Sequence, residues 1–312
     1  MSHSPRRVSI IDVGPRDGLQ GEPEILPTAT KIEFIRRAVD AGIQRLEVTS
    51  FVHPKRVPQM ADAEAVIAGL PRREGVIYIG LVLNRKGFDR AQATGIHEIG
   101  MAVVASDTYN QRNQGVPTAE SVKAWLEIAR AAKAAGIRAN VMISSAFGCP
   151  FEGEVPLRRV LELVEQVMEG SPVDLGIADS IGVAVPSQVR DLVSAVRAKA
   201  PGIPIRCHFH NTRNTGIANA QAALDAGVDS LDSSIGGIGG CPFAPAATGN
   251  IPTDDLLYML DRSGVRTGVS LERIIATSQW LAEQLGRGTP AMLPKAGIFP
   301  QIAEINRARL AG

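Results

Sequence analysis

Short β-rich runs alternate with amphipathic helical stretches along most of the chain, and this alternation limits the fold more than any other feature. We distinguish eight such runs in the 312 residues, spaced by about 25–40 residues. The predicted strands are 8–12, 45–49, 76–82, 97–104, 138–144, 173–179, 203–210 and 229–234. The predicted helices between them are 28–41, 60–70, 87–94, 119–135, 157–169, 187–199 and 216–226.

This count and spacing favour an α/β fold of the (β/α)8 or TIM-barrel type. A doubly wound open sheet is the alternative, but it would usually contain fewer units. Beyond the eighth strand, helices are predicted over 253–262 and 271–285, and a stretch rich in glycine and proline follows. We therefore expect a catalytic barrel domain over 1–285, with a C-terminal helical appendage whose tail, 286–312, packs on the barrel or trails from it.

The near balance of charge argues against a nucleic-acid-binding protein. The chain has 33 basic and 32 acidic residues, a formal net charge of +1, whereas binding to nucleic acid usually requires a strong basic excess. Its cysteines, Cys149, Cys207 and Cys241, are far apart and odd in number, which is typical of free thiols in a reducing compartment. No apolar run approaches the ~20 residues that span a bilayer, and the first residues contain no signal-peptide core. We expect a soluble cytoplasmic protein with no membrane partner.

Two histidines lie one residue apart at the end of the seventh predicted strand. Side chains alternate between the faces of a strand, so His208 and His210 point the same way and can clamp a divalent metal. In a (β/α)8 barrel the site forms at the carboxyl ends of the strands. We therefore looked for partners at the other strand ends.

The loop after the first strand contains Arg16 and Asp17 side by side. This pair could be an ordinary turn with a solvated ion pair. Its place across the barrel mouth from the histidines favours a role for Asp17 as a carboxylate ligand and for Arg16 as the partner of an oxyanion. Together with the amide oxygen of Asn250, these groups form a nitrogen and oxygen donor set. That set suits Mg²⁺ or Mn²⁺ and could also hold Co²⁺ or Zn²⁺.

Other polar residues end or follow the predicted strands. Glu47 points inward near the mouth, where it could be a structural partner of a buried arginine, and it would orient Arg16 if that arginine is the partner. Asp179 could be a metal ligand, a support for a ligand or a hydrogen-bonding cap. Residues assigned to substrate binding or to support of the ligands are Gln20, Ser144, Asp179, Asn211 and Arg213.

The glycine-rich run that begins at Ser233 resembles a phosphate-binding loop only superficially. It lacks a Walker lysine and the G-x-G-x-x-G spacing. A mobile lid that carries a thiol fits it better. Cys241 could be a small buried apolar residue, but on an exposed lid it becomes a candidate proton donor or acceptor.

Several longer motifs resemble those of the 3-hydroxy-3-methylglutaryl-CoA lyase family, within the metal-dependent pyruvate-carboxyltransferase-like barrels. The resemblance spans roughly Val8 to Val269. It rests on DVGPRDGLQ, LEVTSFVHPKRVPQM, AFGCPFEG, DSIGV, HFHN, SSIGGIGGCPFAPAATGN and DDLLYML.

This resemblance implies a carbon–carbon lyase that cleaves a 3-hydroxyacyl-CoA by a retro-Claisen reaction. The products would be acetyl-CoA and a keto acid such as acetoacetate, a reaction of leucine degradation. It implies a divalent metal, Mg²⁺ or Mn²⁺, held by Asp17, His208, His210 and Asn250. It further implies that Arg16, held by Glu47, stabilises the enolate oxygen, that Cys241 returns a proton to the acetyl-CoA carbanion, and that Asp17 takes the hydroxyl proton. A homo-oligomer, specifically a dimer, is also implied.

The chain departs from the usual lyase pattern next to the histidine pair. The lyases typically continue with Asp-Thr-Tyr-Gly, whereas this chain has Asn211-Thr-Arg213-Asn. Asn211 resembles the corresponding residue of the condensing isopropylmalate and homocitrate synthases, and Arg213 adds a cation that could pair with a different substrate carboxylate. Ala-Asp-Ser also replaces Gly-Asp-Thr at the sixth strand end. A lyase for citramalyl-CoA or for a longer branched 3-hydroxyacyl-CoA is therefore an alternative.

Other functional classes fit less well. A condensing synthase would lack the GGIGGCPF lid and would carry a further C-terminal regulatory domain. An amidohydrolase-type hydrolase places its His-x-His on the first strand, and here the pair is on the seventh. A non-catalytic binding barrel would not gather so many polar groups at one mouth.

Overall fold

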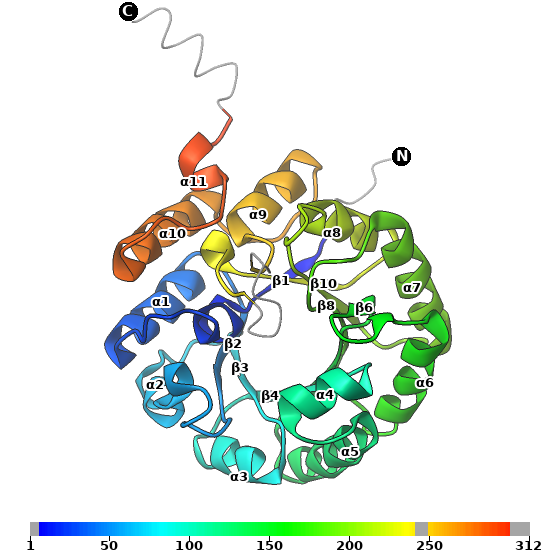
Figure 1. Cartoon of the computed structure of the whole chain (residues 1–312). Coiled ribbons are helices and arrows are strands. Elements are labelled where there is room, and N and C mark those ends of the chain that lie inside the picture. The colour runs from blue at the N-terminus through cyan, green and yellow to red at the C-terminus, as the bar shows by residue number, and fades with distance from the viewer. Residues whose placement is uncertain (1–5, 241–248, 300–312) are drawn as a thin grey trace, which may run out of the picture.

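The computed structural model describes residues 6–240 and 249–299 and has eight parallel strands closed into a barrel (Figure 1). Around the barrel the order is β1-β10-β9-β8-β5-β4-β3-β2, so neighbouring strands follow the chain and the last pairs with the first. This confirms the predicted TIM barrel. The barrel strands are β1 (Ser9–Asp12), β2 (Arg45–Ser50), β3 (Ile77–Leu81), β4 (Glu98–Val104), β5 (Arg138–Ser144), β8 (Leu175–Asp179), β9 (Ile205–Phe209) and β10 (Ser230–Ser233).

Helices surround the barrel and bury their apolar stripes against it (Figure 1). In α6 the buried residues Val160, Leu163, Val164 and Val167 recur at the spacing of one helix face, and each contributes about 1.5–3 kcal/mol by leaving water. The helices around the barrel are α1 (Thr28–Asp40), α2 (Ala63–Gly69), α3 (Arg85–Ala93), α4 (Asp107–Gln114), α5 (Thr118–Ala134), α6 (Leu157–Met168), α7 (Pro186–Lys199), α8 (Gly216–Asp225) and α9 (Thr253–Arg262). Short helical turns are η1 (Gly14–Gly18), η2 (Pro58–Met60) and η3 (Ile235–Gly237), and a small hairpin joins β6 (Gly148–Cys149) to β7 (Gly153–Glu154).

Two of the differences between the predicted and the observed elements have a clear physical reason. Helix α4 lies in a stretch for which no element was predicted, because its residues are almost all polar and show no apolar periodicity. The Ser106 hydroxyl caps its first turn by accepting from the Tyr109 N–H, and Gly115, at φ 82°, ends it. The seventh strand begins at Ile205 and not at residue 203, since Pro204 just before it has no N–H to donate to a neighbouring strand.

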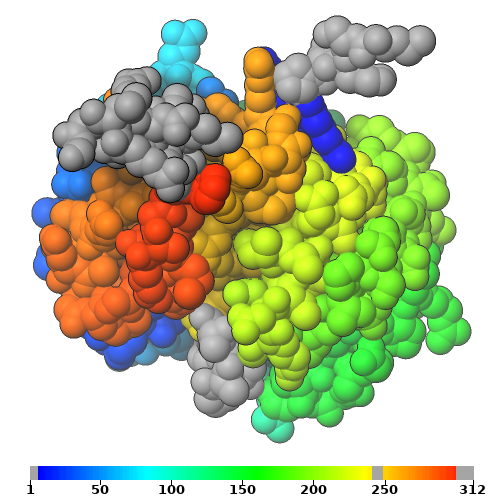
Figure 2. All heavy atoms as spheres, turned by 90° about the horizontal axis from the view of Figure 1, so that it is seen from above, coloured from blue at the N-terminus to red at the C-terminus, as the bar shows by residue number. Residues whose placement is uncertain are grey.

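The C-terminal appendage packs on the barrel as far as the structure describes it. Helix α10 (Leu271–Leu285) contacts α1 and α9, and Arg37 of α1 lies 4.7 Å from the ring centre of Trp280. Helix α11 (Leu293–Ala296) lies on α10, which Figure 2 shows as a red segment against orange. No helix in the described parts of the chain is long and apolar enough to cross a membrane.

The interior of the barrel is unusually rich in charge. Arg45 pairs with Glu98 and Asp174, and Arg206 pairs with Asp232. A small apolar cluster of Ile11, Val13 and Ile79 comes from β1, the residue after it and β3 of the same barrel. Buried charges are tolerated when they are paired, and each of these charged side chains has a partner of opposite sign.

Candidate active site

A cavity of about 1070 Å³ opens over the carboxyl ends of the barrel strands. Its walls contain both polar groups and apolar side chains from several strands and the loops that follow them. Of the residues predicted for the site, seven line it: Arg16, Asp17, Gln20, Glu47, Ser144, His208 and His210. These seven predicted residues therefore lie together at the carboxyl ends of the strands, where the active site of a (β/α)8 barrel forms.

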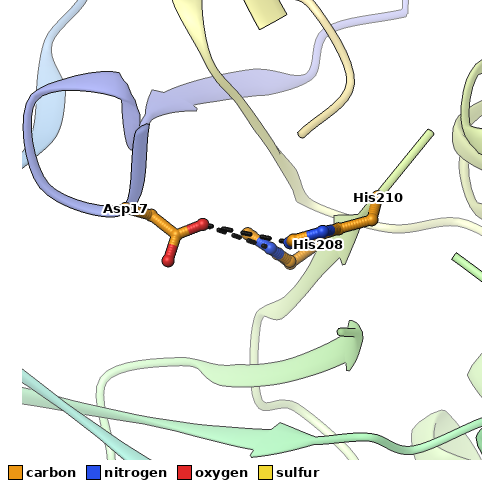
Figure 3. A group of neighbouring side chains, drawn as sticks. All are labelled: Asp17, His208 and His210. Atoms are coloured by element: carbon orange, nitrogen blue, oxygen red, sulfur yellow. Dashed lines mark ion pairs between the residues drawn. The ribbon is translucent and has the colours of Figure 1, made fainter. Parts of the chain in front are cut away.

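The side chains of Asp17, His208 and His210, which line this cavity, point toward one another (Figure 3). His208 lies in β9 and His210 just after it, with ring centres 5.2 Å apart. The Asp17 Oδ2 atom lies 4.0 Å from Nε2 of His208 and 3.9 Å from Nε2 of His210. One ligand atom from each residue lies within 4.8 Å of the others, a grouping that can hold a metal ion.

Asn250 completes this group. Its Nδ2 donates to Oδ2 of Asp17 at 2.9 Å and to the Ile238 carbonyl at 3.2 Å, and its backbone forms a β-bridge with His210. Among the described residues its buried Oδ1 has no hydrogen-bond partner. A buried amide oxygen without a donor is costly unless something else binds it, so the residues present fit a divalent metal with nitrogen and oxygen ligands.

Arg16 is held between two carboxylates. Its guanidinium donates to Asp17 Oδ1 at 2.7 Å and to Glu47 Oε2 at 2.6 Å, and all three side chains are largely buried. The expected contact between Glu47 and Arg16 is therefore present. Charge-assisted hydrogen bonds of this kind fix both the position and the positive charge of a guanidinium beside the cavity.

Burial and neighbouring charges shift the pKa values of Asp17, His208 and His210. Burial alone would raise the pKa of Asp17, but the Arg16 and histidine charges and the Asn250 hydrogen bond hold it at about 2. Burial and the neighbouring His208 lower the pKa of His210 to about 4. Burial also opposes the charged form of His208, yet its hydrogen bond to Asp232 and the charges of Asp232 and Asp17 raise its pKa overall. Asp17 is thus anionic and His210 neutral, as metal ligands must be.

Gly239 of the glycine-rich run packs closely against Asn250 and the backbone of Asp17 and Gly18. Gly239 has φ 106°, and a Cβ atom placed there would lie 2.7 Å from Asn250 Nδ2, 2.8 Å from Gly18 Cα and 3.0 Å from the Asp17 carbonyl oxygen. Only glycine fits such a close approach in this conformation. The predicted proton donor, Cys241, follows two residues later and lies outside the described residues.

Three other predicted residues have structural partners in the loops. Asp179 accepts from the backbone N–H groups of Val183 and Ala184 at 3.0 and 2.9 Å, which corresponds to the cap among its predicted roles. Asn211 Oδ1 accepts from the Gly216 N–H at the start of α8. The Arg213 guanidinium donates to the carbonyl groups of residues 181 and 182. None of these three lines the cavity.

Among the cavity residues that were not predicted are two buried charged ones, Arg206 and Asp232. Each stands two positions from another inward-facing polar residue on its own strand, so a period-two search along the whole strand would have found them. The prediction considered only strand ends.

With this geometry established, comparison with known proteins gives the family. The family model HMGL-like matches residues 7–281. The chain belongs to the HMGL-like family. It is 41% identical to the (R)-citramalyl-CoA lyase of Chloroflexus aurantiacus over 96% of this chain and 98% of the relative. It is 39% identical to a hydroxymethylglutaryl-CoA lyase of Bacillus subtilis over 92% of this chain and 96% of the relative.

Solved structures named as HMG-CoA lyases have the same fold as this chain. The crystal structure of the Bacillus subtilis HMG-CoA lyase has a TM-score of 0.91 at 39% identity and covers 94% of this chain and 98% of its own. An HMG-CoA lyase from Acinetobacter baumannii, in complex with coenzyme A and 3-methylmalate, has a TM-score of 0.93 at 38% identity and covers 97% and 99%. This HMGL-like protein is therefore a carbon–carbon lyase.

Proposed function

We propose that this protein is a metal-dependent lyase that cleaves a branched 3-hydroxyacyl-CoA, of the 3-hydroxy-3-methylglutaryl-CoA type, by a retro-Claisen reaction. The products are acetyl-CoA and a keto acid, which is acetoacetate for that substrate. The observation that carries the proposal is the convergence of Asp17, His208 and His210 beside the buried Arg16 at one cavity. The relatives named as CoA-ester lyases support the substrate class.

The metal would be held by Asp17, His208, His210 and Asn250, and Mg²⁺ or Mn²⁺ suits this set. When bound, it would make the substrate hydroxyl more acidic and bind the oxygen that carries the resulting charge. The remaining chemistry belongs to the side chains of the cavity. Their arrangement keeps a cation and several hydrogen-bonding groups within one buried space.

The bond that breaks lies between C2 and C3 of the substrate. The C3 hydroxyl loses its proton to the Asp17 carboxylate and becomes the ketone of the keto acid, and the electrons of the broken C2–C3 bond pass to the thioester as an enolate. Arg16, fixed by Glu47 at 2.6 Å, stabilises the negative enolate oxygen. The thiol of Cys241 then supplies the proton that converts the C2 carbanion into the methyl group of acetyl-CoA.

Cleavage of citramalyl-CoA is the second candidate. The 41% identity over 96% of the chain to a protein named (R)-citramalyl-CoA lyase favours it. That substrate has one methylene fewer between C3 and the carboxylate, so its cleavage yields acetyl-CoA and pyruvate. The two candidates share the same bond cleavage and the same catalytic groups.

A product assay separates them. Purified protein with Mg²⁺ or Mn²⁺ is incubated with 3-hydroxy-3-methylglutaryl-CoA, with citramalyl-CoA and with longer branched 3-hydroxyacyl-CoA esters, and acetyl-CoA, acetoacetate and pyruvate are measured. The proposal expects acetyl-CoA and acetoacetate from the first substrate. Pyruvate formation alone would favour citramalyl-CoA. No acetyl-CoA from any ester in the presence of metal would overturn the lyase proposal.

A further inference from the structure

We propose that Asp232, clamped by Arg206, is a positioning residue that fixes the tautomer and the orientation of His208. In this arrangement the neutral His208 ring carries its proton on Nδ1, and its unprotonated Nε2 faces Asp17. The proposal deepens the proposed function, because Nε2 is the atom that would bind the metal. The support for His208 comes from a buried ion pair, Arg206 on β9 and Asp232 on β10.

The contact between Asp232 and His208 follows from the strand register. Strands β9 and β10 pair with Leu231 opposite Cys207, so the next residue of each strand, Asp232 and His208, lie side by side. Asp232 Oδ2 is 3.1 Å from His208 Nδ1. A carboxylate can only accept, so Nδ1 must donate, and a neutral imidazole then has its lone pair on Nε2.

Arg206 holds the carboxylate in place. Its Nε donates to Asp232 Oδ1 at 2.5 Å and its terminal NH2 donates to Oδ2 at 2.8 Å. Both side chains are almost completely buried, with exposed fractions of 3% and 1%. Two parallel hydrogen bonds from a rigid guanidinium leave the carboxylate one orientation, and in that orientation Oδ2 faces the histidine ring.

The second histidine lacks such a support. Within the described parts of the chain, the buried Nδ1 of His210 has no hydrogen-bond partner. The two histidines therefore differ. Nδ1 of His208 is hydrogen-bonded to Asp232, whereas no such bond selects the tautomer of His210. Loss of Asp232 would remove the only carboxylate that the structure places on the rear nitrogen of either ring, among the residues described.

The alternative is that Asp232 only neutralises a buried arginine. Glu98 offers a matched control for that role. It is completely buried in the same barrel and accepts from Arg45, Arg138 and Asn140, but it contacts neither histidine. A general effect of breaking a buried ion pair should appear equally in Asp232→Asn and Glu98→Gln, whereas an effect on His208 should appear only in the first.

The first measurement needs neither metal nor substrate. Long-range ¹H–¹⁵N spectra of protein labelled at histidine are recorded at alkaline pH, and His208→Gln assigns the His208 signals. We expect a protonated Nδ1 and an unprotonated Nε2 in the wild type and in Glu98→Gln. In Asp232→Asn we expect a mixture of tautomers. An unchanged tautomer in folded Asp232→Asn would overturn the proposal.

The second measurement is Mn²⁺ affinity by titration calorimetry. We expect Asp232→Asn to bind Mn²⁺ about 10- to 100-fold more weakly, as is usual when the partner of a ligating histidine is lost. Glu98→Gln should bind Mn²⁺ like the wild type even though its melting temperature falls. Equal losses of affinity in both variants, or none in Asp232→Asn, would refute the positioning role.

A third variant guards against failure of Asp232→Asn to fold. Arg206→Lys keeps the positive charge but removes the two parallel hydrogen bonds, so it should shift the His208 tautomer and weaken Mn²⁺ binding in the same direction. Unchanged values in Arg206→Lys would count against the clamp. Because the spectra are taken without substrate, an inactive result in the acyl-CoA assay overturns the proposed function and leaves this test standing.

Discussion

The most informative single substitution is Gly239→Ala, because it perturbs the proposed metal ligands, Asp17, His208, His210 and Asn250, without removing any of them. The residue has φ 106°, and its missing side chain leaves room for Asn250, Gly18 and the Asp17 backbone. An added methyl group would meet atoms of all three at 2.7–3.0 Å, well inside the ~3.5–4.0 Å at which such atoms normally rest. The neighbours must therefore move apart.

The expected cost has two parts. The backbone conformation costs an L-residue roughly 1–2 kcal/mol, and inserting a methyl group into a packed region costs about 1–3 kcal/mol more. The contacts require displacements of the order of 0.5–1 Å in Asn250 and Asp17. Because both residues belong to the metal group, we expect Mn²⁺ to bind about 10- to 100-fold more weakly, as when the support of a ligand is lost.

Gly202→Ala is the matched control. Gly202 also has a positive φ, 85°, but no heavy atom lies within 4 Å of the position of its missing Cβ. It should lose only the conformational cost of roughly 1–2 kcal/mol and keep its metal affinity. The difference in free energy of unfolding between the two variants, measured by urea denaturation, then isolates the steric part.

Calorimetric titration with Mn²⁺ and urea denaturation of both variants test this reasoning. The expected result is a larger loss of stability in Gly239→Ala and a loss of affinity confined to it. If Gly239→Ala bound Mn²⁺ like the wild type, the close packing of this glycine against the metal group would have no functional meaning. Equal destabilisation of the two variants would show that the neighbours yield without cost.

Three further predictions address the site and its support. His208→Ala should lower the metal content of the purified protein, measured by elemental analysis, whereas Cys241→Ala should keep the metal and slow turnover; an unchanged metal content in the first would remove His208 from the ligands. Glu47→Gln should lower kcat at least about 10-fold with a smaller change in KM, because Arg16 loses a charged partner at 2.6 Å; steady-state kinetics would contradict this if only KM changed. Burial raises the pKa of Asp12 to about 7 against the donors that surround it. Because the pKa is higher in the folded than in the unfolded protein, the free energy of unfolding falls as pH rises from about 4 to 7. Urea denaturation should therefore show the wild type losing up to ~4 kcal/mol relative to Asp12→Asn over that range. A difference in stability between the two proteins that does not change with pH would contradict this prediction.

The sequence determined the architecture because the alternation of strands and helices is a local property. Apolar periodicity of two and of 3.6 residues can be recognised within a single segment, and eight such units close into a barrel. The polar α4 had no such periodicity and was missed. The family motifs also indicated Asp17, His208 and His210, which the structure brings within reach of one another.

Tertiary structure decided what each polar residue contacts. Asn250 and Asp17 are 233 positions apart, and only the closure of β10 onto β1 lets the amide donate to the carboxylate. Arg213 carries a charge that suggested a substrate contact, yet its guanidinium binds two carbonyl groups of a neighbouring loop. A sequence gives the type of a side chain and the face it occupies, but the register between strands and the path of each loop select its partner. For this reason the histidine pair could be predicted from the sequence, while the hydrogen bond between Asp232 and His208 depends on the register between β9 and β10 in the folded barrel.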